Sequence, residues 1–161
     1  MYGKILVPLD GSALAERAVS HAVEIARGSG SELLFLQAVN LPMPVVPEAI
    51  LVPDSKWLDE AKRNAVAYLD GVAAPLRNQG IRVKAIVDER PPADAILHVA
   101  EREEAGLIVM STHGRGGLGR MLMGSVAESV FHATARPVML VKPEPVSPPP
   151  SKGVGTRLRV P

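Results

Sequence analysis

The stretch KILVPLDGSALAERAVSHAVEIARGSGSELLFLQAV, residues 4–39, contains the unit from which the rest of the fold can be predicted. It begins with a short run of branched aliphatic residues, which is typical of a strand buried on both faces. Apolar residues then recur every three or four positions from Leu14 to Ala26, which predicts an amphipathic helix with Ser12 as its N-cap. Gly30 ends this pattern, and the apolar run that follows predicts a second strand.

The same alternation of apolar runs and helical periodicity continues along the chain. Further helices are predicted over 55–76, from Pro92 to Ala100 and from Ser125, and further strands over 81–87, 106–111 and 137–142. Strands that alternate with helices of this length require right-handed crossovers. The sequence therefore predicts an open, five-stranded, mainly parallel sheet with helices on both faces, a Rossmann-like α/β fold. Such sheets bind ligands beyond the carboxyl ends of their strands, so residues directly after the first, second and fourth strands are of most interest.

Composition narrows the classes of function. A chain of 161 residues with 47% hydrophobic and 22% charged residues suits one globular domain. With a net charge of +1 and 3% aromatic residues, it has neither a basic stripe for duplex nucleic acid nor stacking platforms for single strands. The absence of cysteine excludes disulfides and thiolate nucleophiles. No secretory signal or bilayer-spanning run is present in the sequence, so we expect a cytoplasmic protein with neither a nucleic-acid nor a membrane partner.

A glycine-rich stretch, STHGRGGLGRMLMGSVAESV at 111–130, follows the fourth predicted strand. It contains GxGxxG from Gly114 to Gly119, the pattern of a dinucleotide-binding turn. That turn belongs after the first strand, with an acidic residue at the end of the next strand, whereas here the following strand ends in Lys142. The phosphate loop GxxxxGK[ST] is not present either. The sequence thus argues against both kinds of nucleotide turn.

The same stretch can still hold an anion. Ser125 and Glu128 form an S-x-x-E pair, which predicts a capping box at a helix start with its free N–H groups and positive dipole end. The preceding glycines can present successive backbone N–H groups, and Arg115 and Arg120 can add charge. The alternative is that Ser125 and Glu128 only cap the helix while the glycines only let a surface loop turn. Local features favour neither interpretation.

The run LIVMSTHGRGGLGRMLMGSVAESV resembles the nucleotide loop of the universal stress protein family, whose ATP-binding members carry G-x2-G-x9-G-[ST]. Nine residues separate Gly114 from Gly124, and Ser125 follows, which fits the second half of that pattern. The opening KILVPLDGS, the helix segment AVEIA and the closing RPVMLVK also match the family in order and spacing. The resemblance covers residues 3–142, within the domain that we place at 1–142, and implies an adenine nucleotide alpha hydrolase-like fold. Residues 143–161 are then a proline-rich, basic C-terminal tail.

The resemblance implies a site for ATP, or for AMP or ADP, with Mg or Mn. Asp10 would contact the ribose or the nucleotide-bound metal, and Pro8 and Leu9 would form a wall beside the adenine. The remaining residues implied by the resemblance are Ala38 and Val39 at the base edge, Met110 and Ser111 beneath the phosphates, and Gly114, Arg115, Gly124, Ser125 and Val126 around them.

By the same resemblance the protein is a stress-response factor and a homodimer, commonly formed through the last strand, here 137–142. Bound ATP, rather than a fast reaction, would carry a signalling or protective function, and no catalytic residue is expected. Two alternatives remain: an adaptor of the same fold that binds no nucleotide, and a slow ATPase. A slow ATPase could use Asp10 and the nucleotide-bound metal, but the sequence offers no evident general base.

Three positions depart from the family's pattern. Ser111 stands where the stricter motif has glycine, Arg90 where many relatives have glycine, and Gly106 where relatives often have aspartate. We expect Arg90 to be solvated rather than to reach a phosphate. Two proline-rich segments are also distinctive. Residues 39–54 are expected to flank the adenine pocket or meet a partner subunit, and the alternative is a variable loop that buries its apolar groups locally. The composition of the tail indicates an extended linker or disorder, and its strand-like TRLRV alternatively predicts docking on a subunit surface.

Overall fold

Helices and strands alternate strictly along the chain. The structure is a computed structural model that describes residues 2–40, 55–112 and 123–142. Its elements are β1 (Lys4–Pro8), α1 (Ala13–Ser29), β2 (Glu32–Ala38), α2 (Ser55–Asn78), β3 (Val83–Asp88), α3 (Pro92–Arg102), β4 (Leu107–Ser111), α4 (Ser125–Ala133) and β5 (Val138–Val141).

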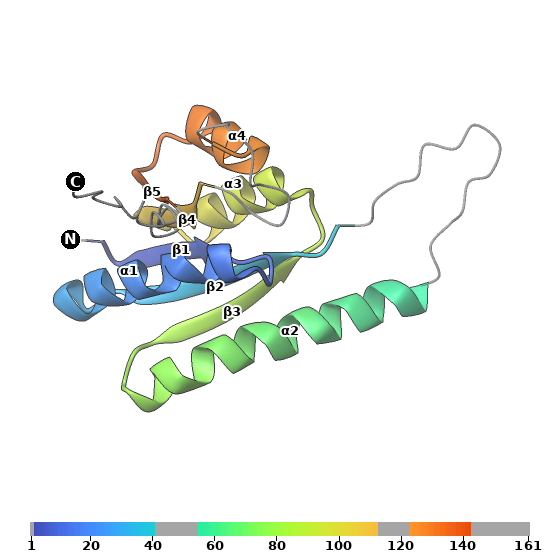
Figure 1. Ribbon diagram of the computed structural model, residues 1–161, viewed down its shortest axis with the longest axis horizontal. Coiled ribbons are helices and arrows are strands. Elements are labelled where there is room, and N and C mark those ends of the chain that lie inside the picture. Colours follow the sequence, from blue (N-terminus) through green and yellow to red (C-terminus); the bar gives the residue numbers. More distant parts are fainter. Residues whose placement is uncertain (1, 41–54, 113–122, 143–161) are drawn as a thin grey trace, which may run out of the picture.

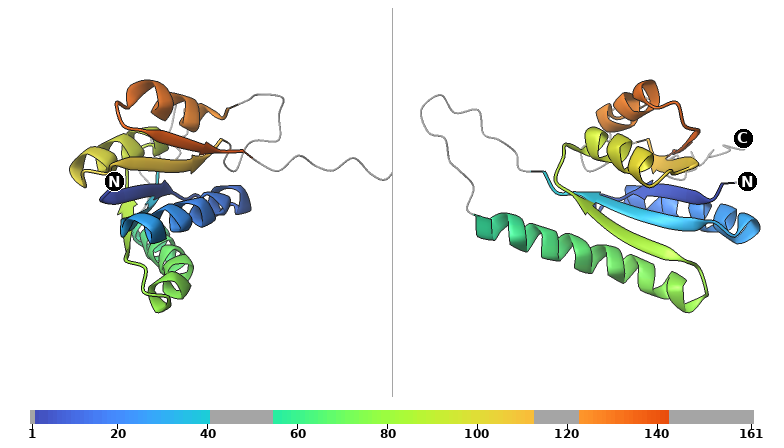
Figure 2. Two further views of the ribbon diagram at one scale, coloured as in Figure 1. Left: turned by 90° about the vertical axis from the view of Figure 1, so that its left-hand side faces the viewer. Right: turned by 180° about the vertical axis from the view of Figure 1, so that it is seen from behind.

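The strands form one parallel sheet in the order β3-β2-β1-β4-β5 (Figure 1). From β1 the chain first moves outward through β2 to β3, and then returns to the other side of β1 for β4 and β5. Right-handed crossovers in two opposite directions place α1 and α2 on one face of the sheet and α3 and α4 on the other (Figures 1 and 2). The direction changes between β1 and β4, which is where open α/β sheets bind ligands.

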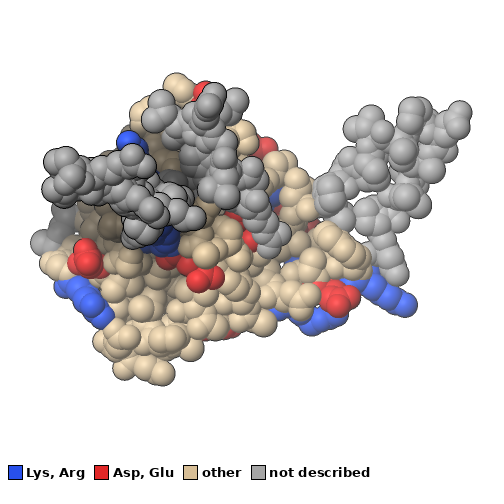
Figure 3. All heavy atoms as spheres, viewed as in Figure 1, with Lys and Arg blue, Asp and Glu red and all other residues tan. Residues whose placement is uncertain are grey.

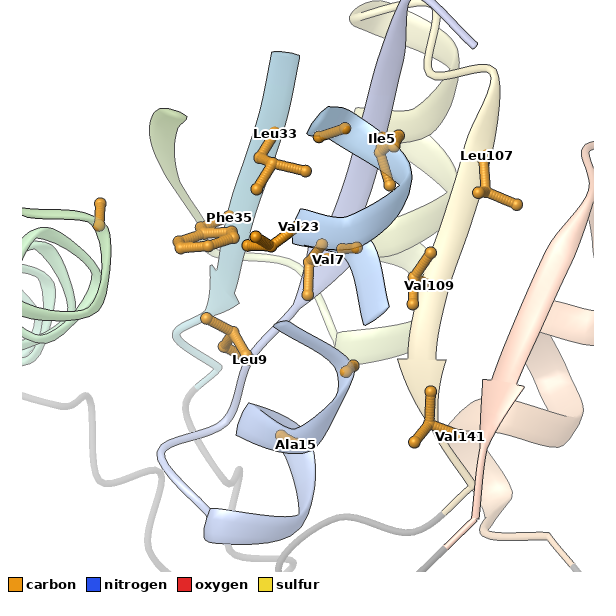
Figure 4. Close-up of a cluster of buried hydrophobic side chains, with 14 of the residues drawn as sticks. Ile5, Val7, Leu9, Ala15, Val23, Leu33, Phe35, Leu107, Val109 and Val141 are labelled. Atoms are coloured by element: carbon orange, nitrogen blue, oxygen red, sulfur yellow. The ribbon is translucent and has the colours of Figure 1, made fainter. Parts of the chain in front are cut away.

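Each face of the sheet has its own hydrophobic core, because successive residues of a strand point to opposite faces. Val7 and Phe35 are fully buried against α1 and α2 (Figure 4). Leu6, Leu34 and Ile108 are fully buried on the opposite face, against α3 and α4. The two cores hold the central strands rigidly, so the residues that follow these strands have a fixed support.

Local sequence signals set the helix ends. Ser12 caps α1, and its Oγ accepts a hydrogen bond from the Ala15 N–H at 3.1 Å. Gly30 ends the same helix in the left-handed region at φ 67°, and its N–H donates to the Ala26 carbonyl at 2.8 Å. Pro92 is the first residue of α3, where the missing N–H costs nothing. These features and the predicted α/β fold are confirmed.

The predicted capping box at α4 is wrong by one residue. Gly124, not Ser125, is the N-cap, and Ser125 is the first helical residue. The reason is that the Glu128 N–H donates to the Gly124 carbonyl at 2.9 Å, so the first intrahelical hydrogen bond of α4 is accepted by Gly124, while the helix begins at Ser125 as predicted. Because glycine has no side chain, α4 begins without a side-chain cap.

None of the helices in the described ranges is both long and apolar enough to cross a membrane. On the face shown in Figure 3, the Lys and Arg side chains of the described residues are interspersed with Asp and Glu rather than gathered in one patch.

Candidate functional site

The chain that follows each central strand is tied to its neighbour in the sheet. Beyond β1, the Leu9 N–H donates to the Leu36 carbonyl at 2.7 Å, and beyond β2, the Val39 N–H donates to the Asp88 carbonyl at 2.8 Å. Beyond β4, the Thr112 N–H donates to the carbonyl of the last β5 residue at 2.9 Å. The backbone at this edge is therefore fixed before any ligand arrives.

The turn after β1 presents a carboxylate at the centre of this edge. Asp10 is half-buried, and its Oδ1 accepts a hydrogen bond from the Ser12 N–H at 2.9 Å. Gly11 between them has a φ of 80°, a conformation that residues with a Cβ rarely adopt. Since Ser12 also caps α1, the carboxylate is held directly in front of that helix.

The start of α4 lies at the end of β4, next to β1 in the sheet. The Gly124 N–H donates to the Thr112 carbonyl at 2.6 Å, which fastens the helix start to the strand end. Glu128 is the first residue whose N–H is bonded within the helix, so the N–H groups of Ser125 and Val126 have no intrahelical acceptor. Together with the exposed Ser125 side chain and the positive dipole end, they form an arrangement that suits an anion.

The other expected site residues lie in two environments. Pro8, Ala38 and Ser111 are the half-buried last residues of β1, β2 and β4. Leu9 and Met110 are buried, with exposed fractions of 3% and 5%, in the cores on opposite faces of the sheet. The side chains of Leu9 and Met110 are therefore largely buried in the protein core, where they support the backbone at the carboxyl ends of the strands.

Several expected residues fall outside the described ranges. These are Gly114 and Arg115, the segment 41–54, which is nearly all of the proline-rich connection, and the tail 143–161. Within the ranges that are described, no group of three His, Asp or Glu side chains is arranged to hold a metal ion.

Arg90 is exposed, as expected, and it also forms an ion pair at the end of β3. Its guanidinium Nη1 donates to Asp88 Oδ2 at 2.7 Å, and its backbone N–H donates to Asp88 Oδ1 at 3.0 Å. Arg90 is therefore anchored to a carboxylate that is only 5% exposed, while its own side chain remains 48% exposed. Burial acts to raise the pKa of Asp88, but the hydrogen bonds from Arg90 outweigh it and hold this pKa below its usual range. The pair lines an open hollow of about 410 Å³ together with Val87 and Glu89.

A second contact that periodicity does not reveal joins α2 to the first turn of α1. The Tyr68 hydroxyl donates to Glu16 Oε1 at 2.9 Å. Burial and then this hydrogen bond raise the pKa of Tyr68 well above its usual range, and the negative charge of Asp10 acts in the same direction. The dipole of the Gly11 backbone N–H acts in the opposite direction and partly offsets the rise in this pKa.

The family model of the universal stress proteins matches residues 1–142. The chain belongs to the universal stress protein family. It is 34% identical over 145 residues to universal stress protein MJ0531 of Methanocaldococcus jannaschii, covering 88% of this chain and 83% of that protein. Its five-stranded sheet with helices on both faces is the adenine nucleotide alpha hydrolase-like fold of that family.

Solved structures of family members share this architecture. The structure of MJ0577 from M. jannaschii is 29% identical, covers 91% of this chain and 99% of its own, and superposes with a TM-score of 0.75. A universal stress protein from Archaeoglobus fulgidus, solved in complex with dAMP, is 25% identical, covers 86% of this chain and 97% of its own, and has a TM-score of 0.62. An adenine nucleotide is therefore a ligand of at least one structural relative.

Proposed function

We propose that this universal stress protein binds ATP, or AMP or ADP, across the carboxyl edge of its sheet, and that it acts as a homodimeric stress-response factor. The observation that carries the proposal is the start of α4. There, a side-chain-free N-cap is fastened to the end of β4 by the 2.6 Å hydrogen bond from the Gly124 N–H to the Thr112 carbonyl, and helix N–H groups without an intrahelical acceptor follow it. The dAMP complex of the A. fulgidus relative supports the same ligand class.

Different parts of the nucleotide would contact different residues along the carboxyl edge of the sheet. Phosphate oxygens would accept from the N–H groups of Ser125 and Val126 and from the Ser125 hydroxyl, and Gly124 would let them approach the backbone closely. Gly114 and Arg115 would complete this end. The remaining assignments are Asp10 at the ribose, Pro8, Leu9, Ala38 and Val39 around the base, and Met110 and Ser111 beneath the phosphates.

A magnesium or manganese ion on the phosphates suits the donor set. Both ions prefer oxygen ligands and are usually held by one or two carboxylates together with substrate phosphates. Asp10 is the carboxylate at the centre of the edge, and its position is already fixed by the Ser12 N–H. The ion would therefore arrive with the nucleotide rather than occupy a preformed protein cage.

A dimer through residues 137–142 is proposed from the position of β5. This strand is an outer strand of the sheet, so one row of its backbone groups points away from β4 (Figure 2). The carbonyls of Pro137 and Val141 accept hydrogen bonds from β4. Because the backbone groups of successive residues in a strand point to alternate sides, the Leu140 N–H points away from β4. Leu140→Pro would remove that outward donor while sparing the β4 ladder, and sedimentation equilibrium should show monomers of unchanged secondary structure. A persisting dimer would place the interface elsewhere.

Calorimetric titration of nucleotide-stripped protein with ATP and magnesium tests the binding proposal. We expect micromolar affinity for the wild type and a marked loss in Asp10→Ala, with GTP as the matched ligand control. Correctly folded wild type that gives no binding heat, and none by a second binding method, would favour the adaptor alternative. Product formed at many turnovers per site would instead favour the slow ATPase.

A further inference from the structure

The end of β3 carries an arginine whose position is fixed by a buried carboxylate. Arg90 Nη1 donates to Asp88 Oδ2 at 2.7 Å, and the Arg90 backbone N–H donates to Asp88 Oδ1 at 3.0 Å. Only 5% of the Asp88 side chain is exposed, against 48% of the Arg90 side chain. Within the described ranges, the Nε and Nη2 groups of Arg90 donate to no protein acceptor. The guanidinium is therefore held in place and keeps donors that a ligand can use.

This arginine lies next to the strand end that we assign to the base. Asp88 is paired with Ala38 in the register of β2 and β3, and its carbonyl accepts a hydrogen bond from the Val39 N–H at 2.8 Å. Arg90 lines the open hollow of about 410 Å³ at the end of β3. The strands β4, β1, β2 and β3 follow one another across the sheet (Figure 1). A nucleotide with its phosphates at β4 and its ribose at β1 thus directs its base across β2 toward this hollow.

The charges around the hollow are balanced. Arg90 is paired with Asp88, and Glu89, the other charged residue of the lining, forms an ion pair with Lys62 of α2. Val87 adds an apolar surface to the same lining. Because positive charge is not in excess, the hollow suits an uncharged ring rather than a phosphate. These features fit a nucleobase.

We propose that Arg90 is a specificity-determining residue that donates a hydrogen bond to N1 of adenine, with Asp88 as its positioning residue. The inference rests on the proposed nucleotide site. The ring atom N1 lies opposite N9, which carries the ribose, so N1 faces β3 when the ribose lies at β1. In adenine N1 is an acceptor and matches a guanidinium donor, whereas in guanine the same atom carries a hydrogen and cannot accept. The arginine thus favours adenine over guanine.

The experiment changes single atoms of the ligand as well as the protein. ATP, 1-deaza-ATP, which lacks N1, and 7-deaza-ATP, which keeps N1, are each titrated calorimetrically with magnesium. Arg90→Ala removes the guanidinium, and Asp88→Asn/Arg90→Ala also removes the buried charge that would otherwise lose its partner. Asp88→Asn alone tests the positioning role. Arg82→Ala is the matched control, because Arg82 is an exposed arginine directly before the opposite end of β3.

We expect the wild type to bind 1-deaza-ATP about tenfold more weakly than ATP, the size of one hydrogen bond to a charged group. It should bind 7-deaza-ATP nearly as well as ATP. Both variants that lack Arg90 should bind ATP about tenfold more weakly and should no longer distinguish it from 1-deaza-ATP. Asp88→Asn should reduce the preference for ATP over 1-deaza-ATP, because the guanidinium is held less firmly. Arg82→Ala should keep the affinities of the wild type.

Equal affinities of the wild type for ATP and 1-deaza-ATP would overturn the contact with N1 and leave the nucleotide site standing. This comparison needs no variant, so it decides the question even if a variant fails to fold. An undiminished preference for ATP in the folded variants that lack Arg90 would overturn the role of this residue. An unchanged preference in Asp88→Asn would overturn the positioning role of Asp88. Failure of the wild type to bind ATP would instead overturn the proposed function, and this inference with it.

Discussion

Replacing Gly124 by aspartate separates stability from binding at the start of α4. Gly124 has φ −76° and ψ 157°, an extended conformation that any residue adopts, so the change does not strain the backbone. Asp and Asn are among the best N-cap residues, and each exceeds glycine by a few tenths of a kcal/mol. The charge of Asp adds ~0.3–1 kcal/mol by its interaction with the helix dipole. We therefore expect Gly124→Asp to unfold at the same or a slightly higher temperature than the wild type.

Binding should change in the opposite direction. Repulsion between a carboxylate and a phosphate charge about 4 Å away weakens the free energy of ATP binding. The loss is ~1 kcal/mol at the dielectric constant of water and ~4 kcal/mol at an effective dielectric constant of 20. These limits correspond to ATP affinities that are ~5-fold to nearly ~1000-fold weaker. Gly124→Asn has nearly the same size and is also a good N-cap, so it isolates the contribution of charge.

The assay is ATP calorimetry of the two variants at low and high salt, with thermal unfolding of each. The affinity difference between Asp and Asn should shrink as salt increases, because screening weakens the repulsion. Equal ATP affinities of the two variants, or a difference independent of salt, would refute the placement of phosphate at this helix start. A lower unfolding temperature for Gly124→Asp would refute the assignment of the N-cap.

Three further predictions concern stability. Phe35→Ala removes a fully buried ring from the α1/α2 core, and urea unfolding should show a loss of about 3–5 kcal/mol. Gly30→Ala should lower the free energy of unfolding by about 1 kcal/mol in the same assay, because Gly30 has a φ of 67°. Gly28→Ala, inside α1 with no atom near its added Cβ, should raise the free energy of unfolding by about 0.5–1 kcal/mol. Equal effects of the two changes would contradict the assignment of Gly30 as the residue that ends α1. Arg90 lowers the pKa of Asp88 in the folded protein. The ionised carboxylate therefore contributes its full stability at a pH above the pKa of Asp88 in the unfolded chain, and this contribution is lost as the pH falls through the lower pKa of the folded protein. Asp88→Asn should therefore be less stable than the wild type at pH 7, and the difference should narrow in acid.

The features that could be predicted from the sequence are those whose causes are local. Ser12 and Gly30 mark the ends of α1 because an N-cap and a left-handed C-cap depend on neighbouring residues alone. The parallel sheet with helices on both faces was predicted from the alternation of strands and helices, because crossovers between parallel strands are right-handed. The order of the strands was not predicted. The start of α4 at Ser125 was predicted correctly, but its N-cap was misplaced by one residue. Gly124 and Ser125 can both serve as an N-cap, and the contact with Thr112 that fixes the helix start is not local.

Contacts between distant segments were beyond sequence reasoning. Nothing in the periodicity of α2 distinguishes Tyr68 as the partner of Glu16, because the side chain lies on the helix face that packs against the core. The Asp88–Arg90 pair had a usable signal, since Asp88 follows a strand directly and stands two residues before a cation. Its burial, which makes the pair significant, becomes visible only in the folded chain.

The most direct test of the nucleotide site is an amide chemical-shift titration of the stripped, isotope-labelled protein with ATP and magnesium. It measures affinity and location in one experiment. We predict saturable shifts at Asp10–Ser12, Ala38–Val39, Ser111–Thr112 and Gly124–Val126, all at the carboxyl edge of the sheet. No saturable shifts, or shifts that cluster away from these residues, would contradict the account.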